Sequence, residues 1–307
     1  MIYTLTLNPA LDKMITFSEI SRSDVNRPLK VEYHAGGKGI NVSIAVSRFK
    51  TENRAVFFSG GENGKKIEKL LEKEGVICSV VKIEEESREN IKLYGEKSKE
   101  EIRVNEKGSM VLKESLNKIN EILNNIEEDS YVVMSGTIPE GIENNFYFET
   151  AKNLKKNKKA KVIIDADLEP MKAALEASPF MIKPNMEELG RIIGKPGNIK
   201  EFIKIVEKYK IEYGFLTNGK KGAYLYNKEK LYFIKSPVVN AVTTLGAGDS
   251  FIGGFISALS QRFELEECLK IAAATAAAKV EERFELDRIN ELVREVYIEE
   301  IKITEEI

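Results

Sequence analysis

The chain has 307 residues, of which 42% are hydrophobic and 31% are charged, and its 47 lysines and arginines nearly balance its 49 aspartates and glutamates. This composition excludes a disordered chain, and a net charge of −2 provides no basic surface for nucleic acid or an anionic membrane. No apolar run approaches the roughly 20 residues needed to cross a bilayer. The first residues lack the pattern of a secretory signal, so we expect a cytoplasmic location.

Cysteine and histidine are scarce, which limits the available chemistry. Cys78 and Cys268 lie in no C-x-x-C pattern, and His34 is the one histidine. A disulfide framework is therefore excluded, a zinc site of cysteine and histidine is not expected, and a Ser-His-Asp triad would depend on His34. We expect acid–base chemistry mainly from carboxylates or lysines, and any metal to be an oxygen-ligated ion such as Mg²⁺.

Apolar, β-branched segments alternate with helical patterns along most of the chain. Strands are expected at Ile2–Leu7, Val56–Ser59, Tyr131–Ser135, Val162–Asp165, Phe180–Lys183 and Gly214–Thr217. Helices are expected between them at Lys65–Lys73, Leu116–Asn124, Asn145–Leu154, Pro170–Ala177, Met186–Ile193 and Ile199–Tyr209, and then in succession at Gly248–Ser260, Leu265–Val280 and Leu286–Val296. This alternation predicts an α/β fold with a mostly parallel sheet covered by helices.

Two segments, at about residues 11–34 and 87–107, interrupt this alternation. They contain short strand-like pieces with little apolar mass, at Lys13–Phe17, Lys30–Tyr33, Asn90–Tyr94 and Glu101–Val104. We expect these pieces to pair in a small sheet that forms a lid beside the main domain. Because no linker rich in proline or serine divides the chain, residues 1–307 are predicted to form a single domain.

The strongest motif is TLGAGDSF at residues 244–251, which opens an apolar helical segment. The small residues Gly246, Ala247 and Gly248 let backbone amides approach a ligand, and the helix N-terminus adds its positive dipole end. This combination suits a phosphate in transfer, and Asp249 in the first turn can accept a proton from a substrate hydroxyl. The alternative is an ordinary glycine turn. The motif is neither a Walker A loop nor a dinucleotide fingerprint.

Two earlier motifs are candidates for binding a sugar. The run AGGKGINVS at residues 35–43 contains three closely spaced glycines that can lie against a polyhydroxyl ligand, with Asn41 as a hydrogen-bonding side chain. A tight turn into a helix at Val42–Phe49 is the alternative for this run. Asp12 follows the first strand, where open α/β sheets bind ligands, although a solvated loop aspartate would give the same pattern.

Two later motifs are candidates for the nucleotide and its metal. In IKPNMEE at residues 182–188, Asn185 and Glu188 lie three apart and face one side of a helix, where they can orient waters on Mg²⁺. A helix cap with a first-turn glutamate is the alternative. The run LTNGKKGA at residues 216–223 reads as strand, glycine turn and strand, and either cradles part of a nucleotide or is a plain hairpin.

The order and spacing of these motifs resemble the ribokinase/PfkB family of sugar kinases over almost the whole chain. The matching segments are Thr6–Lys13, Ala35–Ser43, Ser135–Gly141, Ile182–Leu189 and Leu245–Phe255. The TLNPA and GGKGINVS runs are most similar to the hexose-phosphate branch, which contains 1-phosphofructokinase and tagatose-6-phosphate kinase. The resemblance implies a ribokinase-like three-layer α-β-α sandwich, a small β-sheet lid and a homodimer formed through the lid.

The resemblance also implies ATP- and Mg²⁺-dependent phosphoryl transfer to a hydroxyl of a hexose phosphate, with conversion of fructose 1-phosphate to fructose 1,6-bisphosphate expected first. It makes Asp249 the base and Gly246–Gly248 the anion hole. The residues expected to bind the phosphosugar are Asp12, Arg27, Gly36, Gly37, Lys38, Asn41 and Arg88, of which the two arginines would bind its existing phosphate. The residues expected around the nucleotide are Lys183, Asn185, Thr217, Gly219 and Gly222, with Glu188 at Mg²⁺ through water.

Three segments depart from the family pattern and leave the exact sugar open. The lid reads Ile102-Arg103-Val104-Asn105, the usual Asp-x-Ser-Gly-Glu reads Asp165-Ala166-Asp167-Leu168-Glu169, and Thr137 replaces a serine. Asp165 is still expected near the phosphates. The alternatives are a tagatose-6-phosphate kinase, a kinase of nucleosides or unphosphorylated sugars, and a non-catalytic sugar-phosphate sensor.

The two arginines argue against an uncharged substrate, because guanidinium groups match phosphate oxygens. Arg27 and Arg88 lie in the two lid segments, and we expect them to converge when the lid folds over the site.

Overall fold

A mixed sheet forms the centre of the molecule, as described by a computed structural model for residues 1–228 and 230–303. Its strands are β1 Ile2–Thr6, β4 Asn53–Gly60, β5 Ile77–Ile83, β8 Tyr131–Gly136, β9 Lys161–Ala166, β10 Met181–Ile182, β11 Tyr213–Thr217, β12 Ala223–Asn227, β13 Lys230–Lys235 and β14 Tyr297–Ile301. In the described part of the chain these 10 strands follow the order β14-β13-β12-β11-β10-β9-β8-β1-β4-β5. Neighbours are parallel from β11 to β5, and the remaining strands pair antiparallel.

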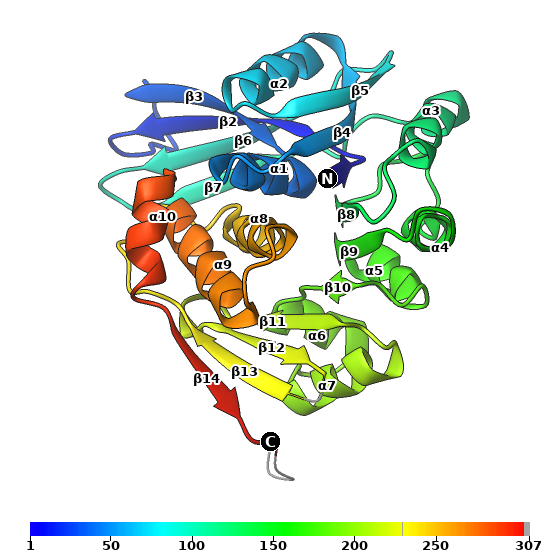
Figure 1. The fold of residues 1–307 in the computed structure, drawn as a ribbon. Coiled ribbons are helices and arrows are strands. Elements are labelled where there is room, and N and C mark those ends of the chain that lie inside the picture. The colour runs from blue at the N-terminus through cyan, green and yellow to red at the C-terminus, as the bar shows by residue number, and fades with distance from the viewer. Residues whose placement is uncertain (229, 304–307) are drawn as a thin grey trace.

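Helices cover both faces of this sheet, and Figure 1 shows the resulting layers. One face carries α1 (Lys38–Arg48), α8 (Ala247–Ser260), α9 (Leu265–Val280) and α10 (Leu286–Val293). The other carries α3 (Lys113–Asn124), α4 (Phe146–Lys158), α5 (Leu168–Leu175), α6 (Met186–Ile193) and α7 (Ile199–Lys208). The predicted α/β sandwich with a mostly parallel central sheet is therefore confirmed.

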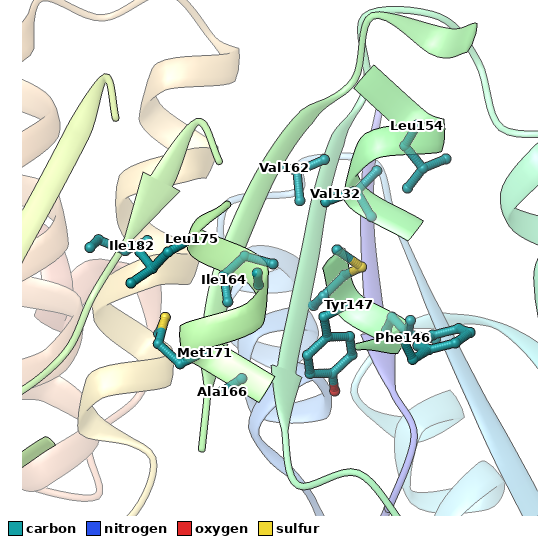
Figure 2. Packing of buried hydrophobic residues seen from close by; sticks show 14 of the residues in the cluster. Val132, Phe146, Tyr147, Leu154, Val162, Ile164, Ala166, Met171, Leu175 and Ile182 are labelled. Atoms are coloured by element: carbon teal, nitrogen blue, oxygen red, sulfur yellow. The ribbon is translucent and has the colours of Figure 1, made fainter. Parts of the chain in front are cut away.

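Apart from the edge strand β5, the parallel strands are buried on both faces, which explains their nearly continuous apolar sequences. Val132 of β8 and Ile164 of β9 meet Tyr147, Met171 and Leu175 of the helices α4 and α5 (Figure 2). A second cluster of buried side chains joins the opposite face to α1, α8, α9 and α10. Because successive strand residues point to opposite faces, strands such as β1, β8 and β11 contribute to both clusters.

The two interruptions in the alternation form a separate sheet, which we call the lid. Its strands are β2 (Ala10–Phe17), β3 (Lys30–Gly36), β6 (Arg88–Gly95) and β7 (Glu101–Asn105), in the order β3-β2-β6-β7. Each strand extends further than the piece predicted for it. The lid lies beside α2 (Gly61–Lys73), at one end of the molecule (Figure 1).

The strand register of the lid sorts its side chains into rows on two faces. A polar row, His34-Asp12-Asn90-Asn105, crosses one face, and an apolar row, Val31-Ile15-Leu93-Ile102, crosses the other. Because side chains alternate along each strand, the polar and the apolar row lie on opposite faces of the lid.

The elements that differ from the predictions lie at the edges of the sheet and at helix N-termini. The strands β5, β13 and β14 are additional, and the helix predicted at Leu286–Val296 ends at Val293, before β14. Helices α1 and α2 begin one turn earlier than predicted. Their first turns contain Gly39 and Gly64, where a Cβ would lie 2.5 Å from the Thr6 hydroxyl and 2.4 Å from the Ser59 hydroxyl respectively. These glycines therefore allow close packing and do not interrupt the helices.

Candidate active site

Several of the predicted site residues lie along the sheet edge at which the parallel strands end. Ser135 of β8, Asp165 of β9 and Thr217 of β11 are each the last or next-to-last residue of their strand at this edge. The chain winds outward in both directions from β1, which lies between β8 and β4. Open α/β sheets bind ligands at such a switch point, beyond the carboxyl ends of the strands.

The N-termini of α1 and α8 meet at this edge and bring two distant motifs together. The helices pack closely, since a Cβ on Gly253 would lie 2.5 Å from the Cβ of Ala45. In their first turns, the side-chain nitrogen of Asn41 donates a hydrogen bond to Oδ2 of Asp249 over 2.8 Å. Two residues 208 positions apart in the sequence are thus fixed beside each other.

The residues 246–248, which we call the anion loop, form the start of α8. Gly246 is the N-cap residue and has a φ of 72°, a conformation that glycine adopts without strain. The first amides of α8 have no partner within the helix, so they are available to a ligand. A Cβ on Gly248 would lie 2.9 Å from Nζ of Lys183, so a side chain there would push against that lysine.

Asp249 is held in an environment suited to a general base. Its carboxyl is buried, and the residue is 7% exposed. Burial, together with repulsion from Asp165, raises the pKa of Asp249 to about 6, although Lys38, Asn41 and Lys183 oppose the shift. A base with a pKa near 6 is ionised at neutral pH and still takes up a proton readily.

Two lysines share one buried carboxylate beside the anion loop. Oδ1 of Asp165 accepts a hydrogen bond from Nζ of Lys38 over 3.4 Å, and its Oδ2 lies 3.5 Å from Nζ of Lys183. Burial alone would raise the pKa of Asp165, but the two lysines hold it below its usual value. Burial likewise opposes the charge of Lys38, but Asp165, Glu188 and Asp249 raise its pKa. The ammonium group of Lys38 therefore stays charged next to the loop.

Asp12 and Gly36, two of the residues predicted to bind the sugar, lie on the polar face of the lid. Asn90 donates a hydrogen bond to Oδ1 of Asp12 over 2.8 Å. A Cβ on Gly36 would lie 2.2 Å from the Asp12 carboxylate, so that position must remain glycine for Asp12 to keep its place. Burial raises the pKa of Asp12, while Asn90 and Arg88 lower it. Gly37 is the N-cap residue of α1 and lies beside Thr6.

The structure separates the two arginines that were expected to converge. Arg88 begins β6 opposite Ala10, and its guanidinium donates to the carbonyls of Asn8 and Glu106. Arg27 is exposed and lies beyond the opposite end of β2 and β3, where Lys30 begins β3. Within one chain, folding of the lid therefore cannot bring Arg27 to Arg88, because both belong to the ends of one rigid sheet.

The nucleotide motifs lie together, with geometry that also satisfies their structural alternatives. Asn185 and Glu188 form a reciprocal capping box at the start of α6, with both hydrogen bonds at 2.8 Å. Thr217 pairs with Asn185 in an isolated parallel bridge. Gly219 starts a short 3-10 turn, and Gly222 packs so tightly that a Cβ would lie 2.3 Å from the Ile234 carbonyl oxygen. Contact of these residues with a nucleotide stays a prediction.

Glu188 retains one carboxylate oxygen for a metal. Its Oε2 accepts the Asn185 amide, and its Oε1 lies 3.6 Å from Nζ of Lys38. In the described ranges, no three histidine, cysteine, aspartate or glutamate side chains form a metal-binding group. Mg²⁺ is often held through water and substrate phosphates by one or two carboxylates. The residues present therefore fit the predicted water-mediated role of Glu188.

Asn8 and Asn90 were not singled out from the sequence. The side-chain nitrogen of Asn8 donates to the Lys107 carbonyl and to the Thr137 hydroxyl, each over 2.9 Å, and so ties the end of β1 to the lid and to β8. Asn90 lies two residues after Arg88 on one strand, so both face the same side. That spacing was the available signal for Asn90.

A family model described as pfkB family carbohydrate kinase matches residues 5–284, which include every predicted site motif. The chain belongs to the pfkB family of carbohydrate kinases. The predicted family and the predicted enzyme class, a kinase acting on a hydroxyl group, are therefore confirmed. ATP is the co-substrate that this family implies.

Similar pfkB kinases cover nearly the whole chain. A 1-phosphofructokinase of Borreliella burgdorferi is 33% identical over 98% of this chain and 99% of its own length. A 1-phosphofructokinase of Bacillus subtilis is 31% identical over 91% and 92%, and a tagatose-6-phosphate kinase of Staphylococcus epidermidis is 30% identical over 98% and 100%. The crystal structure of phosphofructokinase-2 from Escherichia coli with substrates and products has a TM-score of 0.90, with 26% identity over 95% of this chain and 98% of that one.

Within residues 1–228 and 230–303, the helices are too short or too polar to cross a bilayer. The cytoplasmic location stays a prediction.

Proposed function

We propose that this kinase transfers the γ-phosphoryl group of ATP to a hydroxyl of fructose 1-phosphate, giving fructose 1,6-bisphosphate and ADP. The observation that carries the proposal is the position of Asp249, which is buried, fixed by Asn41 and located in the first turn of the helix that presents the anion loop. A base and an anion-binding N-terminus side by side are what transfer from a phosphate to a hydroxyl requires.

The reaction follows from these residues. Asp249 accepts the proton of the sugar hydroxyl, and the oxygen of that hydroxyl attacks the γ-phosphorus of ATP. The bond between this phosphorus and the ADP oxygen breaks, and ADP leaves. The amides of the anion loop and the charged Lys183 stabilise the negative charge on the transferring phosphoryl oxygens. Glu188 would hold Mg²⁺ through water, and the bound ion would neutralise charge on the nucleotide phosphates.

The polar lid face supports a sugar phosphate as the acceptor. Asp12 and Asn90 offer a fixed pair of hydrogen-bonding groups for sugar hydroxyls. Arg88 lies close enough to Asp12 to lower its pKa, and its position allows it to pair with a phosphate on the same sugar. An unphosphorylated sugar would leave this cation without an anionic partner.

Tagatose 6-phosphate is the second candidate acceptor. The relatives named 1-phosphofructokinase and tagatose-6-phosphate kinase have nearly equal identities to this chain, at 33% and 30%. A non-catalytic sensor is disfavoured, because sensing would not need a buried carboxylate with a raised pKa beside the anion loop.

An ADP-release assay distinguishes these candidates. The purified kinase is given ATP and Mg²⁺ with fructose 1-phosphate, fructose 6-phosphate, tagatose 6-phosphate or fructose, each at several concentrations. We expect the highest kcat/KM with fructose 1-phosphate and little turnover of fructose. Preference for tagatose 6-phosphate would select the second candidate, and binding without ADP release from any sugar would favour the sensor.

We further propose that two copies associate through the apolar face of the lid. Near the main domain this face is covered, since Leu11 and Ala35 join a buried cluster with α1, α2 and β4. Farther out, the same face continues with Val31, which is 44% exposed, and Ile102, which is 36% exposed. An apolar sheet face that continues from the core into solvent suits a second copy of the same lid.

This arrangement also offers a role for Arg27. Its side chain makes no hydrogen bond or ion pair to the described residues, and it lies at the tip of the lid. Only a second copy can bring an Arg27 to the phosphosugar at Arg88. Assembly is known in this family, as one structure is of a tetrameric inhibited form of phosphofructokinase-2 from Escherichia coli.

A further inference from the structure

Lys279 lies in the last turn of α9, directly against the anion loop. Its Cε lies 3.4 Å from the position that a Cβ on Gly246 would take, and the side chain of Asn41 is equally close to that position. The adjacent carbonyl of Val280 accepts hydrogen bonds from the amides of Val242 and Thr243, over 2.9 and 3.1 Å. The segment leading into the anion loop is thus attached to the turn of helix that carries Lys279.

The ammonium of Lys279 has no anionic partner. Among the residues that the structure describes, it makes neither a hydrogen bond nor an ion pair, and its recorded contact is the ring of Phe284 at 5.5 Å. Burial lowers the pKa of Lys279, while Glu282, Glu74 and Asp249 act in the opposite direction from a distance. Lys279 is partly exposed, so its ammonium is open to an anion that binds beside the anion loop.

The other two lysines of the site differ from Lys279 in this respect. Lys38 and Lys183 already share the carboxylate of Asp165. Lys183 adjoins Gly248, and Lys279 adjoins Gly246, so positive side chains lie at both ends of the anion loop. The charge of Lys279 also acts on Asp12 and Asp249, which places it on the side of the loop where sugar and base meet.

We propose that Lys279 is a positioning residue for phosphoryl transfer: its side chain packs against the anion loop, and its ammonium adds positive potential at the point where the transferring phosphoryl group is bound. This role rests on the proposed function. Lys38 and Lys183 are already paired with Asp165, so these two lysines alone do not balance the negative charge on the phosphoryl oxygens. A fixed cation beside the anion loop stabilises that negative charge without reorganisation. Substrates bound away from the loop would be little affected.

The test compares Lys279→Met, which keeps the length of the side chain and removes its charge, with Lys279→Arg. Lys270→Met is the matched control, since Lys270 lies on the same helix and pairs with Glu266 away from the site. We expect Lys279→Met to lower kcat about 10- to 100-fold, with KM for ATP and for the sugar phosphate within about twofold of wild type. Lys279→Arg should restore most of the activity, and Lys270→Met should not change it.

A binding measurement separates this role from simple support of the fold. Aluminium fluoride with ADP and sugar phosphate mimics the charged transferring group, and its affinity is measured by calorimetry beside that of ADP alone. We expect Lys279→Met to weaken the aluminium fluoride complex about as much as kcat, with ADP binding and melting temperature unchanged. An unchanged kcat, or equal losses for ADP alone, would overturn the proposal. A wild type that releases no ADP with any sugar phosphate would instead contradict the proposed function.

Discussion

At the scale of single residues, the site depends on a carboxylate that the fold keeps out of water. Asp249 is buried because α1 and α8 pack around it, and its raised pKa is the cost of that burial. An exposed aspartate would be fully ionised at neutral pH but would be a weaker base. The sequence motif alone could not distinguish these cases.

Replacing the base is the first prediction. Asp249→Asn should lower kcat by on the order of 10²–10⁴, the usual contribution of a positioned base, while ATP binding persists. Because the folded-state pKa is raised, the ionised carboxyl destabilises the fold above about pH 6, so the variant should melt at a higher temperature than wild type at neutral pH. Kinetics and thermal denaturation are measured together, with the exposed first-turn residue Asp287→Asn as control. A kcat near that of wild type would remove Asp249 from the role of base.

The same pKa sets the dependence of the rate on pH. Asp249 accepts a proton only when ionised, so kcat/KM should fall about tenfold for each pH unit below about 6 and be level above it. The profile is measured from about pH 4.5 to about pH 8 with saturating Mg²⁺. A kcat/KM that stays level down to about pH 5, as expected for an aspartate with its ordinary pKa of about 4, would mean that burial does not shift the pKa of Asp249 in the working enzyme.

Substitution of Glu188 tests its proposed role in holding Mg²⁺ through water. Glutamine can replace glutamate in a capping box, so Glu188→Gln should keep α6 intact and remove only the negative charge. We expect the Mg²⁺ concentration for half-maximal activity to rise about tenfold, with a smaller change in KM for the sugar. Glu187→Gln, which alters the exposed neighbour, is the control. Identical Mg²⁺ titrations for the two variants would leave Glu188 with a capping role alone.

At the scale of secondary-structure elements, close helix packing aligns the base with its partner. Gly253 lets α8 approach α1, and this approach brings the first turns of both helices into hydrogen-bonding distance. The lid strands show the same dependence, since Asp12 and Asn90 meet only because β2 and β6 pair in one register. A shift of one residue would turn either side chain to the apolar face.

The helix contact predicts a combined effect on stability and rate. Gly253→Ala places a methyl group 2.5 Å from Ala45 and so should separate α1 from α8, costing about 1–3 kcal/mol of stability. Because Asn41 then moves relative to Asp249, kcat should also fall. Denaturant unfolding and steady-state kinetics are compared with Ser260→Ala, at the end of the same helix. Full stability and activity would show that the two helices can adjust without moving the site.

At the scale of the whole molecule, the proposed association of two copies through the apolar face of the lid leads to two predictions. Val31→Glu places a charge in the apolar row of the lid and should convert a dimer into monomers, as measured by light scattering after gel filtration.

Arg27→Ala should leave the dimer intact and raise KM for the phosphosugar about tenfold, because each charge-assisted pair contributes roughly 1.5–3 kcal/mol. Ile77→Glu, at an exposed position of β5, and Arg22→Ala, in the lid loop, are the respective controls. A wild-type monomer, or equal effects of Arg22 and Arg27, would contradict this arrangement.

Local sequence patterns determined most of the layered fold. Buried strands such as β8 and β9 are apolar along their length, and helices such as α6 and α9 have their predicted bounds, because hydrophobic periodicity and capping act over a few residues. The edge strand β14 was not predicted, since Tyr297–Ile301 carries two glutamates and gains its stability by pairing with β13, far away in the sequence.

The motifs also named most of the candidate site, including Asp249, Asn41, Asp12 and Glu188, because glycine loops and first-turn carboxylates are local signals. Only the tertiary structure decided which of them touch. It joined Asn41 to Asp249, placed Lys279 without a partner beside Gly246, and separated Arg27 from Arg88 at opposite ends of the lid. Such distances depend on strand register and on helix packing between segments far apart in the chain, and no local pattern of residues contains them.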